Sequence, residues 1–376
     1  MLATNGPAHD VAVIGGGLVG AATAYGLARE GARVLILDEG DVALRASRGN
    51  FGLVWVQAKG LGMAEYAGWT KASSDRWATL ASILQEETGV DVSHHRPGGF
   101  TLCLSEAELQ TRRDAMRRLH NQPEMVDIPA EILDRDETKR RLPAIGPDVV
   151  GSVYCPLDGH VNALRLFRAL HVGLDNRGVD YRPNCGVDSI RPERGGFSIE
   201  GPWGAVSVGK VVLAAGLGNA RLAPFVGLNA PVKPSKGQIL VTERAARFLD
   251  YPIATLRQTD EGSVMIGDSQ EDLGFDTAVS SPVISLMAQR AVRMFPLLAG
   301  LNVVRSWSAL RVMSPDGFPI YDQSETCAGA FLVTCHSGVT LAANHVLRLA
   351  GDILAGSLAQ DLAPYSARRF DVPAAA

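Results

Sequence analysis

Three glycines and one acidic residue near the start of the chain have the types and spacing that bind a dinucleotide. Gly15 permits a tight turn, Gly17 lets the backbone approach a pyrophosphate, and Gly20 permits close packing of a helix on a strand. Asp38 follows eighteen residues after Gly20, where its carboxylate can accept hydrogen bonds from ribose hydroxyls. An acid at this position, rather than a basic residue, favours NAD or FAD over NADP.

These residues need a strand before them and a helix after them, and the sequence supplies both. Residues 11–14 (VAVI) form a short apolar run that is typical of a buried parallel strand. Residues 21–30 predict a helix of small side chains, and residues 34–37 (VLIL) predict a second strand. The amino terminus of such a helix presents unpaired N–H groups and a positive dipole to phosphates. The alternative is a glycine-rich turn in another parallel α/β fold.

Length and composition predict a globular enzyme with two domains. The chain has 376 residues, of which 46% are hydrophobic and 20% charged, and it exceeds the size at which a single core usually stops growing. Its net charge of −4 argues against non-specific nucleic-acid binding. The basic pairs Arg112-Arg113 and Arg117-Arg118 fall in a helical stretch of mixed charge, which predicts a solvated face.

Cysteine use and hydropathy favour a cytoplasmic protein that binds no metal. The five cysteines are scattered, odd in number and without a CxxC pair, which argues against an iron–sulfur or structural zinc site in this chain. No stretch approaches the roughly 20 apolar residues of a membrane-spanning helix. Residues 1–10 lack the charged and then apolar layout of a signal peptide.

A second glycine-bearing loop, residues 45–53 (RASRGNFGL), follows the first motif and leads into residues 54–56. This order resembles the D-amino-acid oxidase and glycine oxidase family of flavoenzymes. The resemblance implies FAD, with Ser47 at the phosphates and residues 50–53 beside the flavin ring; taken alone, the loop could be a surface turn. The residues that it assigns to FAD in these two loops are Gly15, Gly17, Leu18, Val19, Gly20, Asp38, Glu39, Ala46, Ser47, Asn50, Phe51, Gly52 and Leu53.

Three later stretches resemble cofactor contacts of the same family. Residues 186–188 match the place of main-chain contacts to adenine, and small residues at 214–216 let the dinucleotide lie close to the sheet. The turn at 335–341 resembles one that aims a helix amino terminus, and its positive dipole, at the reduced flavin. Within it, His336 either tunes the flavin or satisfies the turn. The residues assigned on this basis are Val187, Ala214, Ala215, Gly216, Gly338, Val339 and Thr340.

Arg311 is the predicted anchor of a substrate carboxylate. Residues 307–320 resemble the family segment Gly-Leu-Arg-Pro…Asp-Gly-x-Pro, whose arginine binds the carboxylate. A planar guanidinium can make two parallel charge-assisted bonds and so fix the substrate Cα relative to the flavin. The chain departs from this pattern at two positions, with Ala309 in place of the glycine and Val312 in place of the proline. Neither change alters the guanidinium group of Arg311. The alternative role of Arg311 is an ion pair between the two domains. The predicted catalytic residues are Arg311 and His336. Arg311 is also counted among the predicted cofactor-binding residues.

The remaining patterns predict the fold. We expect a strand at 181–190, and His160 as a hydrogen-bonding loop residue rather than a catalyst. Asn162 is expected to cap the helix that follows it. The fold class is α/β (α+β), with a Rossmann-like, glutathione-reductase-like FAD-binding domain and a substrate domain on a largely antiparallel sheet. We expect the FAD-binding domain to comprise residues 1–89, 149–222 and 310–376, and the substrate domain residues 90–148 and 223–309.

The resemblance implies oxidation of the C–N bond of an amino acid or N-substituted amino acid, such as an opine or D-hydroxyproline. Hydride passes from Cα to flavin N5, and the imine hydrolyses. Residues 48–57, 158–162 and 236–238 look most like β subunits of opine oxidase, D-hydroxyproline dehydrogenase and hydrogen cyanide synthase assemblies. That likeness implies partner subunits with an iron–sulfur centre, a second flavin or FMN, through which the chain could lie at the inner membrane. Two alternatives stay open: a free-standing oxidase of glycine, sarcosine or a D-amino acid that produces hydrogen peroxide, and a non-catalytic flavin-holding subunit.

Overall fold

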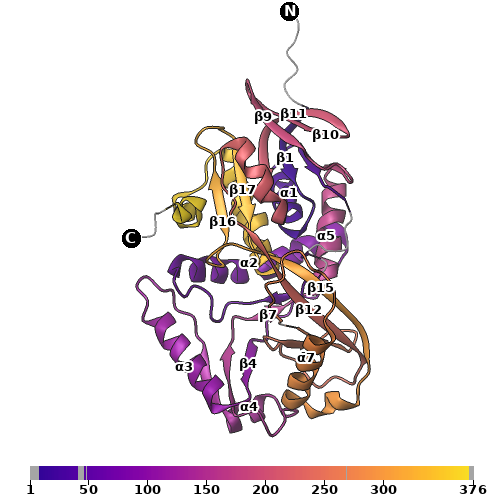
Figure 1. Ribbon diagram of the computed structural model, residues 1–376, viewed down its shortest axis with the longest axis vertical. Coiled ribbons are helices and arrows are strands. Elements are labelled where there is room, and N and C mark those ends of the chain that lie inside the picture. Colours follow the sequence, from indigo (N-terminus) through magenta and orange to yellow (C-terminus); the bar gives the residue numbers. More distant parts are fainter. Residues whose placement is uncertain (1–7, 41–45, 48, 268, 372–376) are drawn as a thin grey trace, which may run out of the picture.

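The computed structural model describes residues 8–40, 46–47, 49–267 and 269–371. These residues form an upper part around a mostly parallel sheet and a lower part around antiparallel strands (Figure 1). The main path of the upper sheet has the order β16-β17-β11-β1-β2-β8. The bounds of its strands are β1 (His9–Ile14), β2 (Val34–Leu37), β8 (Asp180–Arg182), β11 (Gly204–Leu213), β16 (Ile320–Gln323) and β17 (Ala330–Thr334).

Strands β17, β11, β1, β2 and β8 run parallel, and β16 is antiparallel at one edge. Both faces of this sheet are buried, because alternate residues of β1 and β2 belong to two different apolar clusters. Val11 and Val13 pack among the helices, whereas Ala12 and Ile14 face the opposite side. That opposite side is covered by the hairpin β9 (Ser189–Glu193) and β10 (Gly196–Gly201) and by short helical segments.

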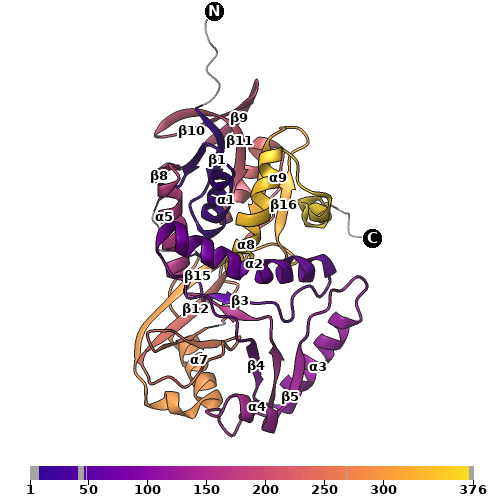
Figure 2. The same ribbon diagram turned by 180° about the vertical axis from the view of Figure 1, so that it is seen from behind.

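The helices of the upper part cover one face of the sheet, and α2 separates the two parts (Figure 2). Trp69, Trp77, Leu80 and Leu84 of α2 are buried in the shared core, as their helical spacing predicts. The bounds of these helices are α1 (Leu18–Arg29), α2 (Ala64–Thr88), α5 (Ala163–Asn176), α8 (Gly338–Asn344), the π-helical turn η4 (His345–Leu349) and α9 (Ala350–Ala355), whereas the short α6 (Asn219–Leu222) packs on the opposite face.

The lower part contains two groups of antiparallel strands, joined by a bridge between Phe100 and Ile253. One has the order β13-β14-β12-β15 and the other β4-β6-β5. The bounds are β4 (Gly99–Cys103), β5 (Glu131–Asp134), β6 (Gly151–Cys155), β12 (Lys233–Arg244), β13 (Leu256–Gln258), β14 (Ser263–Ile266), β15 (Val303–Met313), α3 (Glu106–His120), α4 (Arg135–Arg141) and α7 (Ser281–Met294). A small pair, β3 (Leu53–Val54) with β7 (Gly159–His160), links the second loop to this region.

The expected parallel sheet and the largely antiparallel second sheet are therefore confirmed, and Asn162 caps α5 through its side-chain oxygen. One strand prediction is wrong, because residues 181–190 form the end of β8 and the start of β9 rather than one strand. Between them Asn184 adopts a left-handed conformation with φ of 58°, and the Cys185 N–H donates to the Asp38 carbonyl. The division into domains stays a proposal; it places β6 in the FAD-binding domain, whereas β6 pairs with β4 and β5 of the lower part. None of the described helices is both long and apolar enough to cross a bilayer.

Candidate active site

The glycine loop between β1 and α1 leaves no room for side chains. Gly15 has φ of 107°, and a Cβ there would lie 2.6 Å from the Ala214 carbonyl oxygen. A Cβ on Gly20 would lie 1.9 Å from the Gly15 carbonyl oxygen, which shows how closely α1 packs on the loop. At the first turn of α1, the Leu18 N–H donates to the Ser47 hydroxyl over 2.8 Å. The two predicted loops therefore meet at this helix terminus.

A cavity of about 470 Å³ begins at this loop and runs along the carboxyl ends of the parallel strands; we call it the dinucleotide cavity. It brings together most of the residues that the sequence assigned to FAD. Gly20 and Gly52 line neither this cavity nor the next one. The predicted residues that line it are Gly15, Gly17, Leu18, Val19, Asp38, Glu39, Ala46, Ser47, Asn50, Val187, Ala214, Ala215, Gly216, His336 and Gly338.

Asp38 is buried at the wall of the dinucleotide cavity and holds backbone N–H groups. Its Oδ2 accepts from Gly16 over 2.5 Å and its Oδ1 from Gly40 over 2.8 Å. The spacing alone did not predict this bracing of the glycine loop. Glu39 lines the same cavity, and the ribose role of both acids stays a prediction. At the place predicted to contact adenine, the Val187 carbonyl accepts from Arg221 Nη2 over 2.7 Å.

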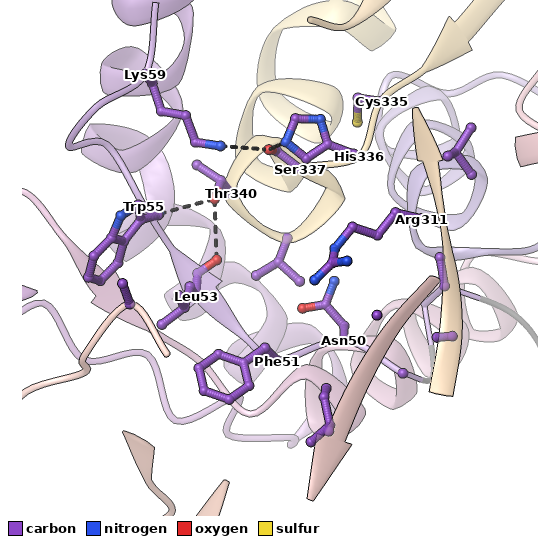
Figure 3. A pocket seen from close by; sticks show the side chains of 18 of the residues that line it. Asn50, Phe51, Leu53, Trp55, Lys59, Arg311, Cys335, His336, Ser337 and Thr340 are labelled. Carbon is purple, nitrogen blue, oxygen red and sulfur yellow. Dashed lines mark hydrogen bonds between the residues drawn. The ribbon is translucent and has the colours of Figure 1, made fainter. Parts of the chain in front are cut away.

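A second cavity, of about 380 Å³, adjoins the first; we call it the central cavity (Figure 3). The two share five lining residues: Ala46, Asn50, Val312, Cys335 and His336. Of the predicted residues, the central cavity also has Phe51, Leu53, Arg311, Val339 and Thr340 on its wall. Its described wall carries three cations, Lys59, Arg112 and Arg311, and no Asp or Glu. A compartment with this charge favours an anionic ligand.

Arg311 reaches the central cavity from β15, across the strand pair that β15 makes with β12. Its Nη1 donates to the Ser269 carbonyl over 2.8 Å, and its side chain points toward Asn50 (Figure 3). Gly237 of β12 lies directly beneath it, because a Cβ there would be 2.4 Å from Nη1. The glycine therefore makes the space that the guanidinium occupies, a requirement that sequence reasoning missed.

His336 lies where the two cavities meet and is neutral at physiological pH. Burial, followed by the charges of Lys59 and Arg311, lowers the pKa of His336 to about 3. Its Nε2 is 3.0 Å from the Ser337 hydroxyl, which also accepts from Lys59 Nζ over 3.3 Å and from the Tyr66 hydroxyl over 3.1 Å. Both predicted roles of His336, tuning the flavin and satisfying the turn, stay predictions.

Thr340 and Arg257 both help to hold the second loop in place. The Thr340 hydroxyl accepts from the Trp55 N–H over 3.1 Å and donates to the Leu53 carbonyl over 3.2 Å, which ties the loop to α8 (Figure 3). From β13, the buried Arg257 donates through Nε to the Phe51 carbonyl over 2.6 Å. Burial lowers the pKa of Arg257 to about 10. Neither Arg45 nor Arg48 of this loop is among the described residues.

Several residues of the site were missed or misjudged from the sequence. Lys59 and Arg257 were not singled out, and no local pattern marks either one. Arg112 is exposed, as its assignment to a solvated face predicts, but sequence reasoning missed that it also lines the central cavity. His160 lies on β7 outside both cavities; its backbone pairs with His95, and its Nδ1 is buried without a described partner.

Comparison with known proteins decides the family. The family model described as "FAD dependent oxidoreductase" (DAO) matches residues 10–346. The chain belongs to this family. It is 52% identical to a subunit of opine oxidase from Agrobacterium tumefaciens (strain Ach5) over 96% of this chain and 97% of that protein. It is 28% identical to hydrogen cyanide synthase subunit HcnC of Pseudomonas aeruginosa, over 98% of each chain. The crystal structure of glycine oxidase from Geobacillus kaustophilus superposes with a TM-score of 0.87 at 26% identity, covering 95% of this chain and 98% of that one.

The chain is accordingly an FAD-dependent oxidoreductase, and its cavities fit that cofactor. The crowded glycine loop lets the backbone, with the first turn of α1, face a pyrophosphate. Asp38 and Glu39 supply acids on the wall where a ribose would need acceptors. Beyond them, Leu310, Val312 and Val333 give the wall of the dinucleotide cavity an apolar surface that suits a flat ring.

Proposed function

We propose that this protein oxidises the C–N bond of an amino acid or N-substituted amino acid, such as an opine or D-hydroxyproline. The observation that carries the proposal is the position of Arg311. Its guanidinium lines the central cavity, while its chain neighbours Leu310 and Val312 line the dinucleotide cavity. A carboxylate bound to Arg311 would therefore hold its Cα beside the cofactor. The similarity to the opine oxidase protein of Agrobacterium supports the same substrate class.

The side chains of the central cavity have three tasks in this reaction. Arg311 binds and orients the carboxylate. The cations Lys59 and Arg112 lower the pKa of a nearby substrate amine, so that the neutral amine predominates when bound. Phe51 and Trp55 add apolar surface to the cavity wall, which would help to exclude water from a bound substrate. FAD, when bound, supplies the group that accepts the hydride from Cα, and the imine product then hydrolyses in water. The described lining contains no carboxylate base, and this route requires none.

We further propose that the chain acts as one subunit of a heteromeric dehydrogenase that passes electrons to partner chains. This part rests on the similarity to two proteins that are named as subunits, one of opine oxidase and one of hydrogen cyanide synthase, over nearly their whole lengths. The second candidate is a free-standing oxidase that produces hydrogen peroxide. The superposition on glycine oxidase over 95% of this chain favours that alternative.

Anaerobic reduction of the flavin tests both proposals together. The purified yellow protein is mixed under nitrogen with octopine, nopaline, D-hydroxyproline, glycine, sarcosine or D-proline, and air is then admitted. Bleaching that persists in air supports a dehydrogenase that needs a partner. Bleaching with rapid recovery and stoichiometric peroxide supports the free-standing oxidase. If no compound bleaches the flavin, the proposed amine oxidation is wrong.

A further inference from the structure

Phe275 is an exposed aromatic side chain on the wall of the dinucleotide cavity. It belongs to residues 269–280, a segment between β14 and α7 that we call the strap. Phe275 is 71% exposed, and among the described residues of the strap it alone lines this cavity. A single exposed apolar side chain is ordinary on a protein surface. The position of Phe275 is therefore significant only if the strap fixes it there.

The strap is fastened to β12 at both of its ends. Lys236 and Glu271 exchange two backbone hydrogen bonds, over 2.9 and 3.0 Å. The side-chain nitrogen of Gln238 donates to Glu271 Oε1 over 2.7 Å, and its side-chain oxygen accepts from the Ser280 N–H over 2.9 Å. One glutamine of β12 thus joins the start of the strap to its end.

A buried lysine holds the middle of the strap. Lys236 is 1% exposed, and its Nζ donates to Asp276 Oδ2 over 2.7 Å and to the Ala278 carbonyl over 2.9 Å. A buried ammonium requires such partners, so these contacts fix the residue that follows Phe275 in the chain. Lys236 also pairs with Leu310 across β12 and β15, and Leu310 lines the dinucleotide cavity. The lysine therefore sets Phe275 near the apolar wall of that cavity.

The tip of the strap is a tight turn with two exposed apolar residues, Leu273 and Phe275. The Asp276 N–H donates to the Leu273 carbonyl over 3.2 Å, and Gly274 within the turn has φ of 58°. Leu273 is 53% exposed and lines neither the dinucleotide cavity nor the central cavity. The turn thus places one apolar side chain at the cavity and the other away from it.

We propose that Phe275 is a cofactor-binding residue, which contacts FAD in the part of the cavity that Leu310 and Val312 line, and that Lys236 positions it. Water leaves the exposed ring when a flat apolar group binds beside it, and this burial favours retention of the cofactor. The strap also meets the proposed carboxylate anchor, because its first residue, Ser269, accepts from Arg311 through its carbonyl. That contact lies outside the tip, so a change of Phe275 leaves it intact.

Release of FAD from the loaded protein tests the contact with the cofactor. The protein is diluted, the appearance of free FAD is followed by its fluorescence, and thermal stability is measured on the same samples. Phe275→Ala removes the ring, whereas Phe275→Tyr keeps it. Leu273→Ala is the matched control, because it removes an exposed apolar side chain from the same turn.

We expect Phe275→Ala to release FAD about 10-fold faster than the wild type does, within the range found when an aromatic side chain that stacks on a base is removed. The Phe275→Tyr and Leu273→Ala proteins should release FAD as the wild type does. An unchanged rate in Phe275→Ala, or an equal increase in Leu273→Ala, would overturn the inference.

Asp276→Ala tests the positioning role of Lys236 through an exposed residue, so the buried lysine stays in place. It should accelerate FAD release in the wild-type background but not in the Phe275→Ala background, because both changes remove the same contact. Acceleration in both backgrounds would mean that the strap acts on FAD without Phe275. That result, or no acceleration in either background, would overturn the positioning role.

Discussion

Replacing Gly237 by alanine tests the position of Arg311 without changing any charge. Gly237 pairs with Ala309 across β12 and β15, beneath the Arg311 side chain. The new Cβ would lie 2.4, 2.6 and 2.7 Å from Nη1, Cζ and Nη2 of Arg311. Ordinary van der Waals contact begins at about 3.5 Å, so the guanidinium must move by about 1 Å.

A displacement of this size has a large effect on a reaction that depends on orientation. Misplacing a positioning group by about 1 Å can lower a rate roughly 100-fold, which corresponds to about 2.7 kcal/mol. We therefore expect kcat/KM for the amine that reduces the flavin to fall by about 100-fold in Gly237→Ala. Bound FAD should not change, because Gly237 lies outside the dinucleotide cavity.

The assay is anaerobic flavin reduction followed by stopped-flow absorbance, with FAD content and thermal stability measured on the same samples. Gly351→Ala is the matched control, since no atom lies within 4 Å of a Cβ added on that residue of α9. It should leave the kinetics unchanged and stabilise its helix slightly. Wild-type kinetics in a folded, FAD-loaded Gly237→Ala protein would refute the placement of the carboxylate on Arg311.

Three further predictions follow from the same contacts. Arg311→Lys keeps the charge but loses the fork, so kcat/KM should fall by about 10- to 100-fold in steady-state assays, and an unaltered KM and kcat would contradict the assignment. Arg257→Met removes the donor to the Phe51 carbonyl, and leaving that carbonyl without a partner costs about 1–3 kcal/mol. The protein should therefore release FAD more readily on dilution, which flavin fluorescence would measure. Burial lowers the pKa of His345 to about 3, while its Nε2 stays 2.9 Å from the Tyr321 hydroxyl. Between pH values of about 3 and about 6.5, His345 is therefore protonated in the unfolded chain but neutral in the folded protein. The free energy of unfolding consequently falls as the pH falls through this window. His345 contributes about 2 kcal/mol to the loss from pH 7 to pH 5, so urea unfolding should show a loss smaller by about that amount in His345→Gln.

The part of the site that sequence predicted best is local in the chain. The glycine loop, its strand and its helix are contiguous, so spacing alone indicates how they fold. Ser47, 29 residues away from Leu18, meets it at the start of α1, and the resemblance had placed this residue near the phosphates. Residues 260–262 (DEG) between two apolar runs likewise predict a hairpin, and the structure has it in β13 and β14.

The parts that sequence could not predict depend on contacts between distant segments. Nothing local shows that Arg112, on the solvated face of α3, also lines the central cavity, or that Glu108 of the same helix is bound by Arg290, 182 residues later. Arg257 reaches the Phe51 carbonyl across 206 residues. The strand expected at 181–190 is interrupted because Cys185 donates to the Asp38 carbonyl, a contact with the end of β2. Pro183, Asn184 and Gly186 in this segment are turn formers that disfavour a strand, so the sequence itself also indicated this break.

The most direct test of the central claim is product analysis after a single anaerobic turnover. Octopine is mixed with an excess of flavin-loaded protein, the loss of flavin absorbance is recorded, and the quenched mixture is examined by mass spectrometry. Oxidation of a C–N bond beside a carboxylate consumes one water for each flavin reduced. It predicts either one arginine and one pyruvate or one alanine and one 2-oxo-5-guanidinopentanoate, because octopine has a carboxylate on each carbon beside its nitrogen. Intact octopine with oxidised flavin, or bleaching without either pair of products, would contradict it.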